Sequence, residues 1–335
     1  MVTTKGRICF SFFFLHSNRE PSDVPSDGFR FSELDSKPCY FNTKPMTKKK
    51  KKQKKEHYIL RRITALACLL LICCIVLRLT RFHKHNGVLQ PLAGETKYIK
   101  LLGNYVPVQQ GVAVSSFAAA DFHMQDNGRL QYTGSTDTLF GIDVSSHQGR
   151  IDWQRVAADG VQFAFLRAGS RGYTEGLLYR DERFEENYRG AVQAGIPIGA
   201  YFFSQATSVK EAEEEAKLLL EILDGRELQY PVVFDWEYVN ETARTTPMKP
   251  QQVSECCLAF CRIIEDAGYQ PMVYFNCYTA YLYYDLTLVD EIPFWAAEFA
   301  DSPSFYYRYS ILQYSCTGSV DGIKGNVDLN LAFIS

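Results

Sequence analysis

Eight short apolar segments follow one another from residue 140 to the C-terminus, and helical patterns separate the first five. The strand-like segments cover residues 140–145, 163–168, 197–204, 230–238, 270–275, 293–299, 309–315 and 326–333. The helical patterns cover residues 151–159, 183–194, 209–223 and 251–267, and residues 278–291 are a candidate fifth helix. Alternating strands and helices are typical of a parallel sheet, and eight such strands close into a barrel. We therefore predict an α/β fold, a TIM-like (β/α) barrel of eight strands.

The predicted barrel has to be irregular because the chain is short near its end. Residues 141–335 number 195, against ~250 for a regular barrel of this kind. Only residues 300–308 join the sixth and seventh strands, and only residues 316–325 join the seventh and eighth. A parallel crossover needs about a dozen residues or more. We therefore expect about five helices rather than eight, and an antiparallel strand among the last ones.

The fourth strand segment ends in two carboxylates. Residues 230–237 read YPVVFDWE, an apolar run that stops at Asp235 and Glu237. Side chains alternate along a strand, so these two acids point to one side and Trp236 to the other. Burying acids is costly, and neighbouring carboxylates hold different pKa values, one group charged and one protonated. This pairing indicates chemistry that cleaves glycosidic bonds.

The same reasoning places other polar side chains beside this pair. In such barrels the chemistry lies at the C-terminal ends of the strands. We predict four catalytic residues at that end: Asp143, Asp235, Glu237 and Asp328. We predict seven substrate-binding residues there: Arg167, Tyr201, Tyr274, Asn276, Trp295, Glu298 and Gln313.

We predict no metal and no cofactor at this end of the barrel. So many acids would suit a metal, but His147 is the only histidine near them in the predicted arrangement. None of the ten cysteines forms a C-x-x-C pair with zinc spacing, and five of them in the body cannot form a complete disulfide framework. We expect these cysteines to be small buried hydrophobic residues.

Charge divides the chain into two parts with different tasks. Residues 1–140 carry 21 Lys and Arg against 10 Asp and Glu, whereas residues 141–335 carry 15 against 28. A basic head followed by an acidic body indicates anchoring in the first part and chemistry in the second. The acidic body argues against nucleic acid as a partner.

An uncharged apolar run at residues 63–77 predicts a membrane anchor. The run reaches 17 residues if it is counted through Leu79 past Arg78, the short end of the ~17–25 that span a membrane. A cleaved signal peptide is the alternative, but no small-residue cleavage site follows the run. Ten Lys and Arg lie in residues 44–62 against three in residues 78–84, which predicts a cytoplasmic N-terminus and an exported body.

These observations give five expected regions. Residues 1–45 are unstructured, with Met46 as the expected true start. Residues 46–62 are a basic cytoplasmic segment, residues 63–79 a transmembrane signal anchor, and residues 80–139 an extracytoplasmic stalk or linker. Residues 140–335 form the catalytic barrel. The expected location is therefore the cell membrane, crossed once.

Several motifs of the body closely resemble glycoside hydrolase family 25, the lysozymes related to the Chalaropsis enzyme. The motifs are GIDVSSHQG at 141–149, IDW at 151–153, RGY at 171–173, GAYFFSQA at 199–206, PVVFDWE at 231–237, ART at 243–245, QYS at 313–315, GSVDGI at 318–323 and VDLN at 327–330. The resemblance implies an irregular barrel with five helices. It also implies cleavage of the β-1,4 bond between N-acetylmuramic acid and N-acetylglucosamine in bacterial peptidoglycan.

The resemblance assigns roles to the acids. Glu237 resembles the general acid that protonates the leaving oxygen, with Asp235 raising its pKa and stabilising the oxocarbenium or orienting the substrate's acetamido group. Asp143 and Asp328 match the other acidic positions. Whether an aspartate or the acetamido group attacks the sugar stays open. The chain departs from the family at Leu312, where members often carry a tryptophan.

The prediction is therefore a membrane-anchored muramidase that acts as a monomer on peptidoglycan glycan strands. Two alternatives stay open. The barrel would be another hydrolase of N-acetylhexosamine glycans, such as a chitinase-like enzyme, or a glycan-binding barrel without catalysis.

Overall fold

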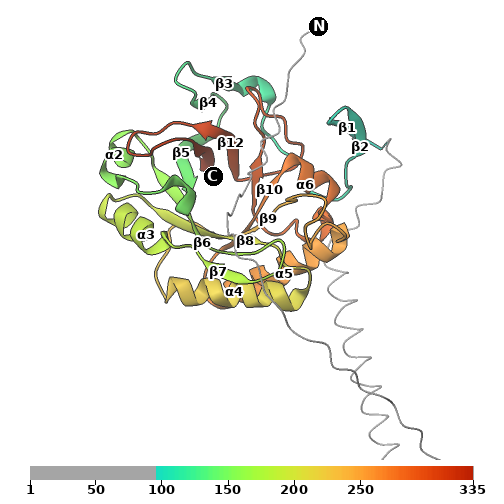
Figure 1. Cartoon of the computed structure of the whole chain (residues 1–335). Helices are drawn as coiled ribbons and strands as arrows, with labels where there is room; N and C mark the ends of the chain where they lie inside the picture. Colours follow the sequence, from blue (N-terminus) through green and yellow to red (C-terminus); the bar gives the residue numbers. More distant parts are fainter. Residues whose placement is uncertain (1–95, 335) are drawn as a thin grey trace, which may run out of the picture. The chain divides into compact units, whose positions relative to one another are not determined.

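A closed sheet of eight strands forms the centre of the computed structural model, which describes residues 96–334 (Figure 1). The barrel strands are β5 (Asp137–Val144), β6 (Phe163–Arg171), β8 (Ile198–Ser204), β9 (Val232–Trp236), β10 (Pro271–Asn276), β11 (Phe294–Ala297), β12 (Ile311–Gly318) and β13 (Val327–Ile334). They are hydrogen-bonded in the order β5-β13-β12-β11-β10-β9-β8-β6, and β5 also pairs with β6, which closes the barrel. The predicted eight-stranded barrel is confirmed.

One barrel strand runs against the others. β13 is antiparallel to both β12 and β5, whereas every other neighbouring pair in the barrel is parallel. The connection from β12 to β13 contains no helix, because so few residues cannot cross back over the sheet. As a result, the start of β13 lies at the same end of the barrel as the C-terminal ends of the parallel strands.

The described residues contain five α-helices, as expected. They are α2 (Trp153–Ala158), α3 (Phe184–Gln193), α4 (Val209–Leu223), α5 (Pro250–Asp266) and α6 (Cys277–Leu282). Three 3-10 turns accompany them: η1 (Ala119–Asp121), η2 (Ser146–Gln148) and η3 (Leu286–Leu288). The candidate helix at 278–291 is thus two short pieces, α6 and η3. Figure 1 shows α4 and α5 packed side by side against the barrel.

Helix α4 illustrates how local sequence sets the boundaries of these helices. The Ser208 hydroxyl accepts a hydrogen bond from the Glu211 N–H at 3.4 Å and begins the helix. Asp224 adopts a left-handed conformation with φ 48°, and the helix ends there. Ala212, Ala216 and Leu219 lie at helical spacing and are fully buried against the barrel.

Apolar side chains fill both sides of the barrel wall. Inside the barrel lies a cluster made by residues from most strands: Phe163, Phe165, Val233, Met272, Tyr274, Trp295, Ala297, Ile311 and Ala332. The larger cluster lies between the strands and the surrounding helices. Trp236 belongs to this outer layer, with its ring 5.6 Å from that of Tyr283. The predicted opposite orientation of Trp236 and its neighbouring acids is therefore observed.

Residues 96–139 pack onto the barrel. They include β1 (Tyr98–Leu101), β2 (Asn104–Pro107), β3 (Phe122–Met124) and β4 (Leu130–Tyr132). Elsewhere in the chain, the short strand β7 (Leu178–Arg180) pairs antiparallel with the end of β6. The Phe117 ring stacks on Phe333 of β13 with centroids 4.0 Å apart. Phe122 and Leu130 are almost fully buried. We expected a stalk or linker at residues 80–139, with residues 128–132 as a short extended segment against the body. Strand β4 and the buried Leu130 confirm that segment. The packing of Phe117 and Phe122 was not anticipated, because isolated apolar residues give no periodic signal.

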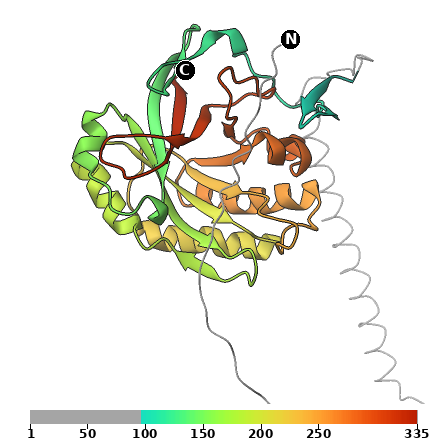
Figure 2. The same ribbon diagram turned by 45° about the horizontal axis from the view of Figure 1, so that its top comes forward.

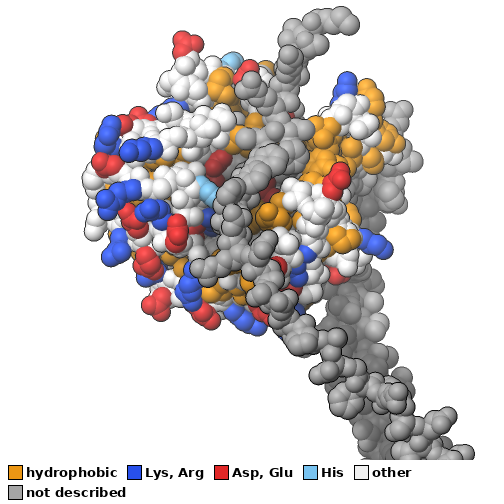
Figure 3. Space-filling view, in the orientation of Figure 1, with side chains coloured by type: hydrophobic (Ala, Val, Ile, Leu, Met, Phe, Trp, Pro, Cys, Tyr) orange, Lys and Arg blue, Asp and Glu red, His pale blue; other side chains and the backbone are white. Residues whose placement is uncertain are grey.

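Charged side chains of both signs intermix on the face shown in Figure 3. Many of them form exposed ion pairs, such as Arg150 with Glu186 and Arg180 with Glu221. Such pairs contribute little to stability, about 0–1 kcal/mol each. The fold therefore depends on its two apolar layers.

Part of the sequence prediction lies outside the described residues. The predicted regions 1–45, 46–62 and 63–79 all precede residue 96, as does the beginning of the predicted stalk. Between residues 96 and 334, no helix combines the length and the apolar character that crossing a membrane requires.

Candidate active site

A cavity of about 250 Å³ opens at the C-terminal end of the parallel barrel strands. Its walls are made by Asp143, Ser145, His147, Gln148, Arg167, Tyr201, Phe203, Asp235, Glu237, Tyr274, Asn276, Trp295, Phe299, Gln313, Cys316, Asn326 and Asp328. All four predicted catalytic acids line this cavity. Six of the seven predicted substrate-binding residues line it too.

Strand register brings the acids together. Asp143 on β5 pairs directly with Asp328 on the antiparallel strand β13. Asp235 on β9 has Tyr274 of β10 beside it. Glu237 follows directly after β9 and points to the same side as Asp235, as the alternation rule requires.

Asp143 is held by a network of amides and aromatic side chains. Gln313 Nε2 and Asn330 Nδ2 each donate a hydrogen bond to Asp143 Oδ2 at 2.8 Å. Tyr274 donates its hydroxyl hydrogen to Gln313 Oε1 at 2.9 Å, and Trp295 Nε1 donates to Asn330 Oδ1 at 2.9 Å. Burial raises the pKa of Asp143 to about 6, although the two amide donors lower it by stabilising the charged form.

Glu237 is a partly buried carboxyl group with one weak hydrogen-bond partner among the described residues. Asn276 Nδ2 donates a hydrogen bond to Glu237 Oε2 at 3.2 Å. Burial raises the pKa of Glu237 to about 7, the Asn276 donor lowers it, and the charge of Asp143 raises it further. We predicted that the charge of Asp235 would raise the pKa of Glu237. In the structure burial is the main cause, and the charge that adds to it is that of Asp143.

Asp235 is the least stabilised of the acids. Its Oδ1 atom is buried and has no hydrogen-bond partner in the described part of the chain. Burial raises its pKa well above the usual value, and the charges of Glu237 and Asp143 add to this rise. Arg167 opposes it, since its positive charge lowers the pKa of Asp235. Arg167 is itself fixed, because its Nε donates to Asp181 Oδ2 at 2.8 Å.

Asp328 completes the acidic set. Burial raises its pKa well above the usual value, and the charges of Asp143 and Glu237 raise it further. Four carboxyl groups therefore share one cavity under conditions that disfavour full ionisation. Raised pKa values among neighbouring carboxyl groups are typical of acid–base sites.

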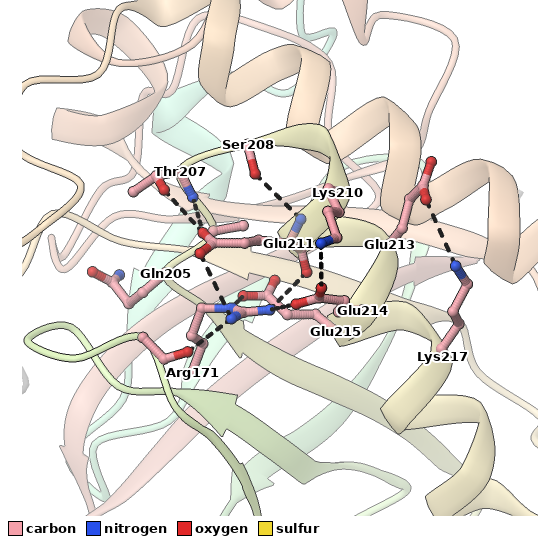
Figure 4. Close-up of polar contacts among 12 residues, drawn as sticks. Arg171, Gln205, Thr207, Ser208, Lys210, Glu211, Glu213, Glu214, Glu215 and Lys217 are labelled. Carbon is pink, nitrogen blue, oxygen red and sulfur yellow. Dashed lines mark hydrogen bonds and ion pairs between the residues drawn. The ribbon is translucent and has the colours of Figure 1, made fainter. Parts of the chain in front are cut away.

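A second polar network fixes the backbone just after β9. Gln205 Nε2 donates to the Glu237 carbonyl oxygen at 2.9 Å, and Arg244 Nη1 donates to the Gln205 carbonyl oxygen at 2.9 Å. Arg244 also pairs with Glu211 of α4 at 2.6 Å. Figure 4 shows Gln205 and Glu211 beside the buried Arg171, which donates to other acids of α4. This network connects α4 to the chain segment that carries Glu237.

Glu298 does not line the cavity, contrary to our prediction. Its Oε2 accepts a hydrogen bond from the Ser304 N–H at 2.7 Å, so it holds the loop after β11. Strand alternation gives the reason: Trp295 and Phe299 share a side of the chain, and residue 298 points to the other side.

Our sequence analysis also missed several residues of the cavity wall. They are Ser145, His147, Gln148, Phe203, Phe299, Cys316 and Asn326. Alternation from Asp143 points to Ser145, and alternation from Tyr201 points to Phe203. The others lie in loops or bulged segments, where no simple period applies.

The cysteines and acids of the described residues do not form a metal centre. No group of three or more His, Cys, Asp or Glu between residues 96 and 334 has an arrangement suited to a metal ion. Cys256, Cys257 and Cys261 are buried in α5.

Comparison with known proteins shows the family to which the barrel belongs. The family model described as glycosyl hydrolases family 25 matches residues 142–323, more than half of the chain. The autolytic lysozyme of Clostridium acetobutylicum is 32% identical over 192 residues, which cover 57% of this chain and 54% of that protein. Lysozyme M1 of Streptomyces globisporus is 31% identical over 212 residues, covering 59% of this chain and 69% of that protein.

A solved structure agrees with these matches. The bacterial lysozyme of Streptomyces coelicolor is 28% identical, with a TM-score of 0.50 over 60% of this chain and 94% of that one. The chain thus spans about half the length of the autolytic lysozyme and nearly all of this shorter relative. By the extent of the family match, the chain belongs to the glycosyl hydrolases of family 25.

Proposed function

We propose that the protein is a peptidoglycan muramidase, which hydrolyses the β-1,4 bond between N-acetylmuramic acid and N-acetylglucosamine. The observation that carries this proposal is Glu237, a partly buried carboxyl group with a pKa of about 7 in the barrel cavity. Near neutral pH a large fraction of this group holds a proton, as a general acid requires. Similarity to two lysozymes over the barrel supports the choice of substrate.

Glu237 would give its proton to the glycosidic oxygen as the bond to the sugar breaks. Positive charge then develops on the ring of the N-acetylmuramic acid, and Asp143 is positioned to stabilise it. With a pKa of about 6 and two amide donors, Asp143 is mostly charged near neutral pH. The Glu237 carboxylate formed in this step then accepts a proton from the incoming water.

Asp235 would act on the group that attacks the sugar. Its pKa is raised by burial, but a cation that develops beside it favours its charged form. In that form it stabilises the oxocarbenium or orients the acetamido group of the substrate. Asp328, beside Asp143 in the register, contributes a further carboxyl group.

We also propose that the barrel works outside the cell as a monomer, tethered by residues 63–79. The support is the uncharged run at 63–77 and the excess of Lys and Arg before it. Tethering would concentrate an acidic enzyme at an anionic wall that does not attract it. Deleting residues 46–80 should release the activity from the membrane fraction, and activity that stays wall-bound after the deletion would contradict the tether.

The enzymatic proposal is tested by the release of reducing muramic acid ends from purified cell walls. Glu237→Gln should lower the rate at least about a hundredfold, since it removes the general acid. Glu298→Gln is the matched control, because Glu298 lies at the same end of the barrel but outside the cavity. Wild-type release by the Glu237→Gln variant would refute the mechanism. Cleavage of chitin oligosaccharides alone would favour the chitinase-like alternative, and binding without cleavage the glycan-binding one.

A further inference from the structure

A second, larger cavity lies beside the catalytic cavity. This second cavity has a volume of about 810 Å³ and shares Phe299 and Cys316 with the first. The remaining walls are Met124, Asp126, Asn127, Gly128, Ala300, Asp301, Tyr314, Ser315, Thr317, Gly318, Ser319 and Leu329. One wall is therefore the turn between β3 and β4, and the opposite wall is the end of the barrel where β11, β12 and β13 meet. We call this cavity the hairpin groove.

The hairpin groove lies at the catalytic end of the barrel. Residues Ser315–Gly318 form the C-terminal end of β12, and Leu329 lies near the start of the antiparallel β13. Figures 1 and 2 both show β3 and β4 beside this part of the barrel. A polymer bound across the catalytic cavity thus passes beside the hairpin groove, since Phe299 and Cys316 line both cavities.

The β3–β4 hairpin is firmly attached to the barrel. Phe122 and Leu130, one on each strand, are 2% and 3% exposed. Arg129 Nη2 donates to Asp159 Oδ2 at 2.7 Å, and its guanidinium lies 4.1 Å from the Phe140 ring centroid. The turn itself, with Gly128 at φ 78°, stands above this buried base. A wall fixed in this way offers a preformed surface, which reduces the cost of binding.

The hairpin lies before the residues of the family match, which are 142–323. The hairpin groove is therefore formed between a segment outside that match and the barrel.

The groove lining suits a neutral sugar. The amide of Asn127, the hydroxyls of Ser315, Thr317 and Ser319, and the carboxylates of Asp126 and Asp301 can bond hydroxyl and acetamido groups. Met124 and Phe299 offer apolar surface to a sugar face. None of the lining residues, all in the described chain, is Lys or Arg, so the groove has no cation for the lactyl carboxylate of N-acetylmuramic acid and suits the neutral N-acetylglucosamine residues of a strand better.

We propose that the β3–β4 turn is a wall of the substrate site, and that the hairpin groove binds sugar residues of the glycan strand beyond those at the cleaved bond. This inference rests on the proposed function, since it takes the ligand to be a peptidoglycan glycan strand. It predicts that the enzyme prefers long strands over the shortest fragment that it cleaves.

The test compares full-length variants on long, peptide-free glycan strands and on the shortest cleavable fragment. Thr317→Trp places a large ring in the groove from an exposed position, and the double variant Met124→Ala/Asp126→Ala removes side chains from the hairpin wall. We expect each to lower the ratio of kcat/KM for long strands to that for the fragment about tenfold, or ~1.4 kcal/mol. His123→Ala is the control, because His123 is exposed on the same hairpin but does not line the groove. A melting temperature for each variant checks folding.

A separate binding measurement distinguishes the groove from the reaction. Peptide-free strands are bound to the Glu237→Gln variant with and without Thr317→Trp, and the added ring should weaken binding about tenfold. If the wild type cleaves walls but no variant changes the length preference or the binding, the groove inference fails while the proposed function stands. If nothing is cleaved but Thr317→Trp still weakens strand binding, the groove inference stands while the proposed function fails. An effect only on peptide-bearing walls would overturn the inference in favour of the peptide.

Discussion

Replacing Asn276 with alanine should move the alkaline limb of the pH–activity profile to higher pH. Asn276 donates to Glu237 at 3.2 Å, and this bond opposes the burial that raises the pKa of Glu237 to about 7. A hydrogen bond to a charged group contributes ~1.5–3 kcal/mol, and one pKa unit corresponds to ~1.4 kcal/mol. Because this bond is long, we take the lower figure and expect a rise of about one pKa unit.

The sign follows from the role of Glu237. A general acid is active while it is protonated, so kcat/KM falls as the pH rises through the pKa of the free enzyme's acid. The fall should centre near pH 7 in the wild type, where the pKa of Glu237 is about 7, and at higher pH in the variant. The assay is the initial rate of reducing-end release from purified walls between about pH 5 and about pH 9.

A matched variant separates this effect from loss of a helix cap. Asn276 Oδ1 accepts from the Thr279 N–H at 3.0 Å and caps α6, so alanine also costs about 1 kcal/mol of stability. Asn276→Asp keeps the capping oxygen, but it loses the donor and adds a negative charge, which raises the pKa of Glu237 further. Both variants should therefore shift the limb upward, and only the alanine should lower the melting temperature. An unchanged limb, or one at lower pH, would refute Glu237 as the acid.

Three further predictions concern stability, measured by urea unfolding. Because the pKa of Glu237 is about 7 rather than 4.5, its charge destabilises the fold as the pH rises. The free energy of unfolding of Glu237→Gln should therefore match that of the wild type at about pH 4 and exceed it by up to ~3 kcal/mol at about pH 8. A difference that stays constant with pH would contradict this. Arg171→Met should lower the free energy of unfolding by ~3–5 kcal/mol at about pH 8 and by less at about pH 5, because it leaves the buried Glu215, whose pKa is about 7, without its ion-pair partner. Equal losses of stability at both pH values would count against this explanation. Arg129→Ala should cost ~1 kcal/mol, since its pair with Asp159 is only partly buried, and a larger loss would mean that the hairpin depends on it more than its contacts suggest.

The barrel and its acids could be predicted because they follow from the alternation of side chains along a strand and from the lengths of the connections between strands. Strand alternation placed Asp235 and Glu237 on one side and Trp236 on the other, and the structure agrees. The short connections near the end of the chain implied an antiparallel strand among the last ones, and the structure shows that it is β13. These features depend on local geometry that any sequence of this pattern must obey.

The other features were mispredicted either because strand alternation was not applied to every residue or because they depend on contacts between distant segments. Glu298 was assigned to the cavity although it lies three residues from Trp295, a spacing that strand geometry places on opposite sides. Asn330 was overlooked, although it follows Asp328 by two residues and holds Asp143. The packing of Phe117 on Phe333 could not be predicted, because nothing in the local sequence indicates which distant surface a single aromatic residue will cover.

The different states of Asp143 and Glu237 follow from how many donors each one receives. Asp143 is buried and accepts two amide hydrogen bonds at 2.8 Å, whereas Glu237 is partly buried and accepts one at 3.2 Å. Donors stabilise the charged form, which agrees with pKa values of about 6 and about 7. Near neutral pH the proton therefore stays longer on Glu237. The donors to Asp143 are oriented in turn by Tyr274 and Trp295, so the aromatic walls of the barrel help to decide which acid keeps the proton.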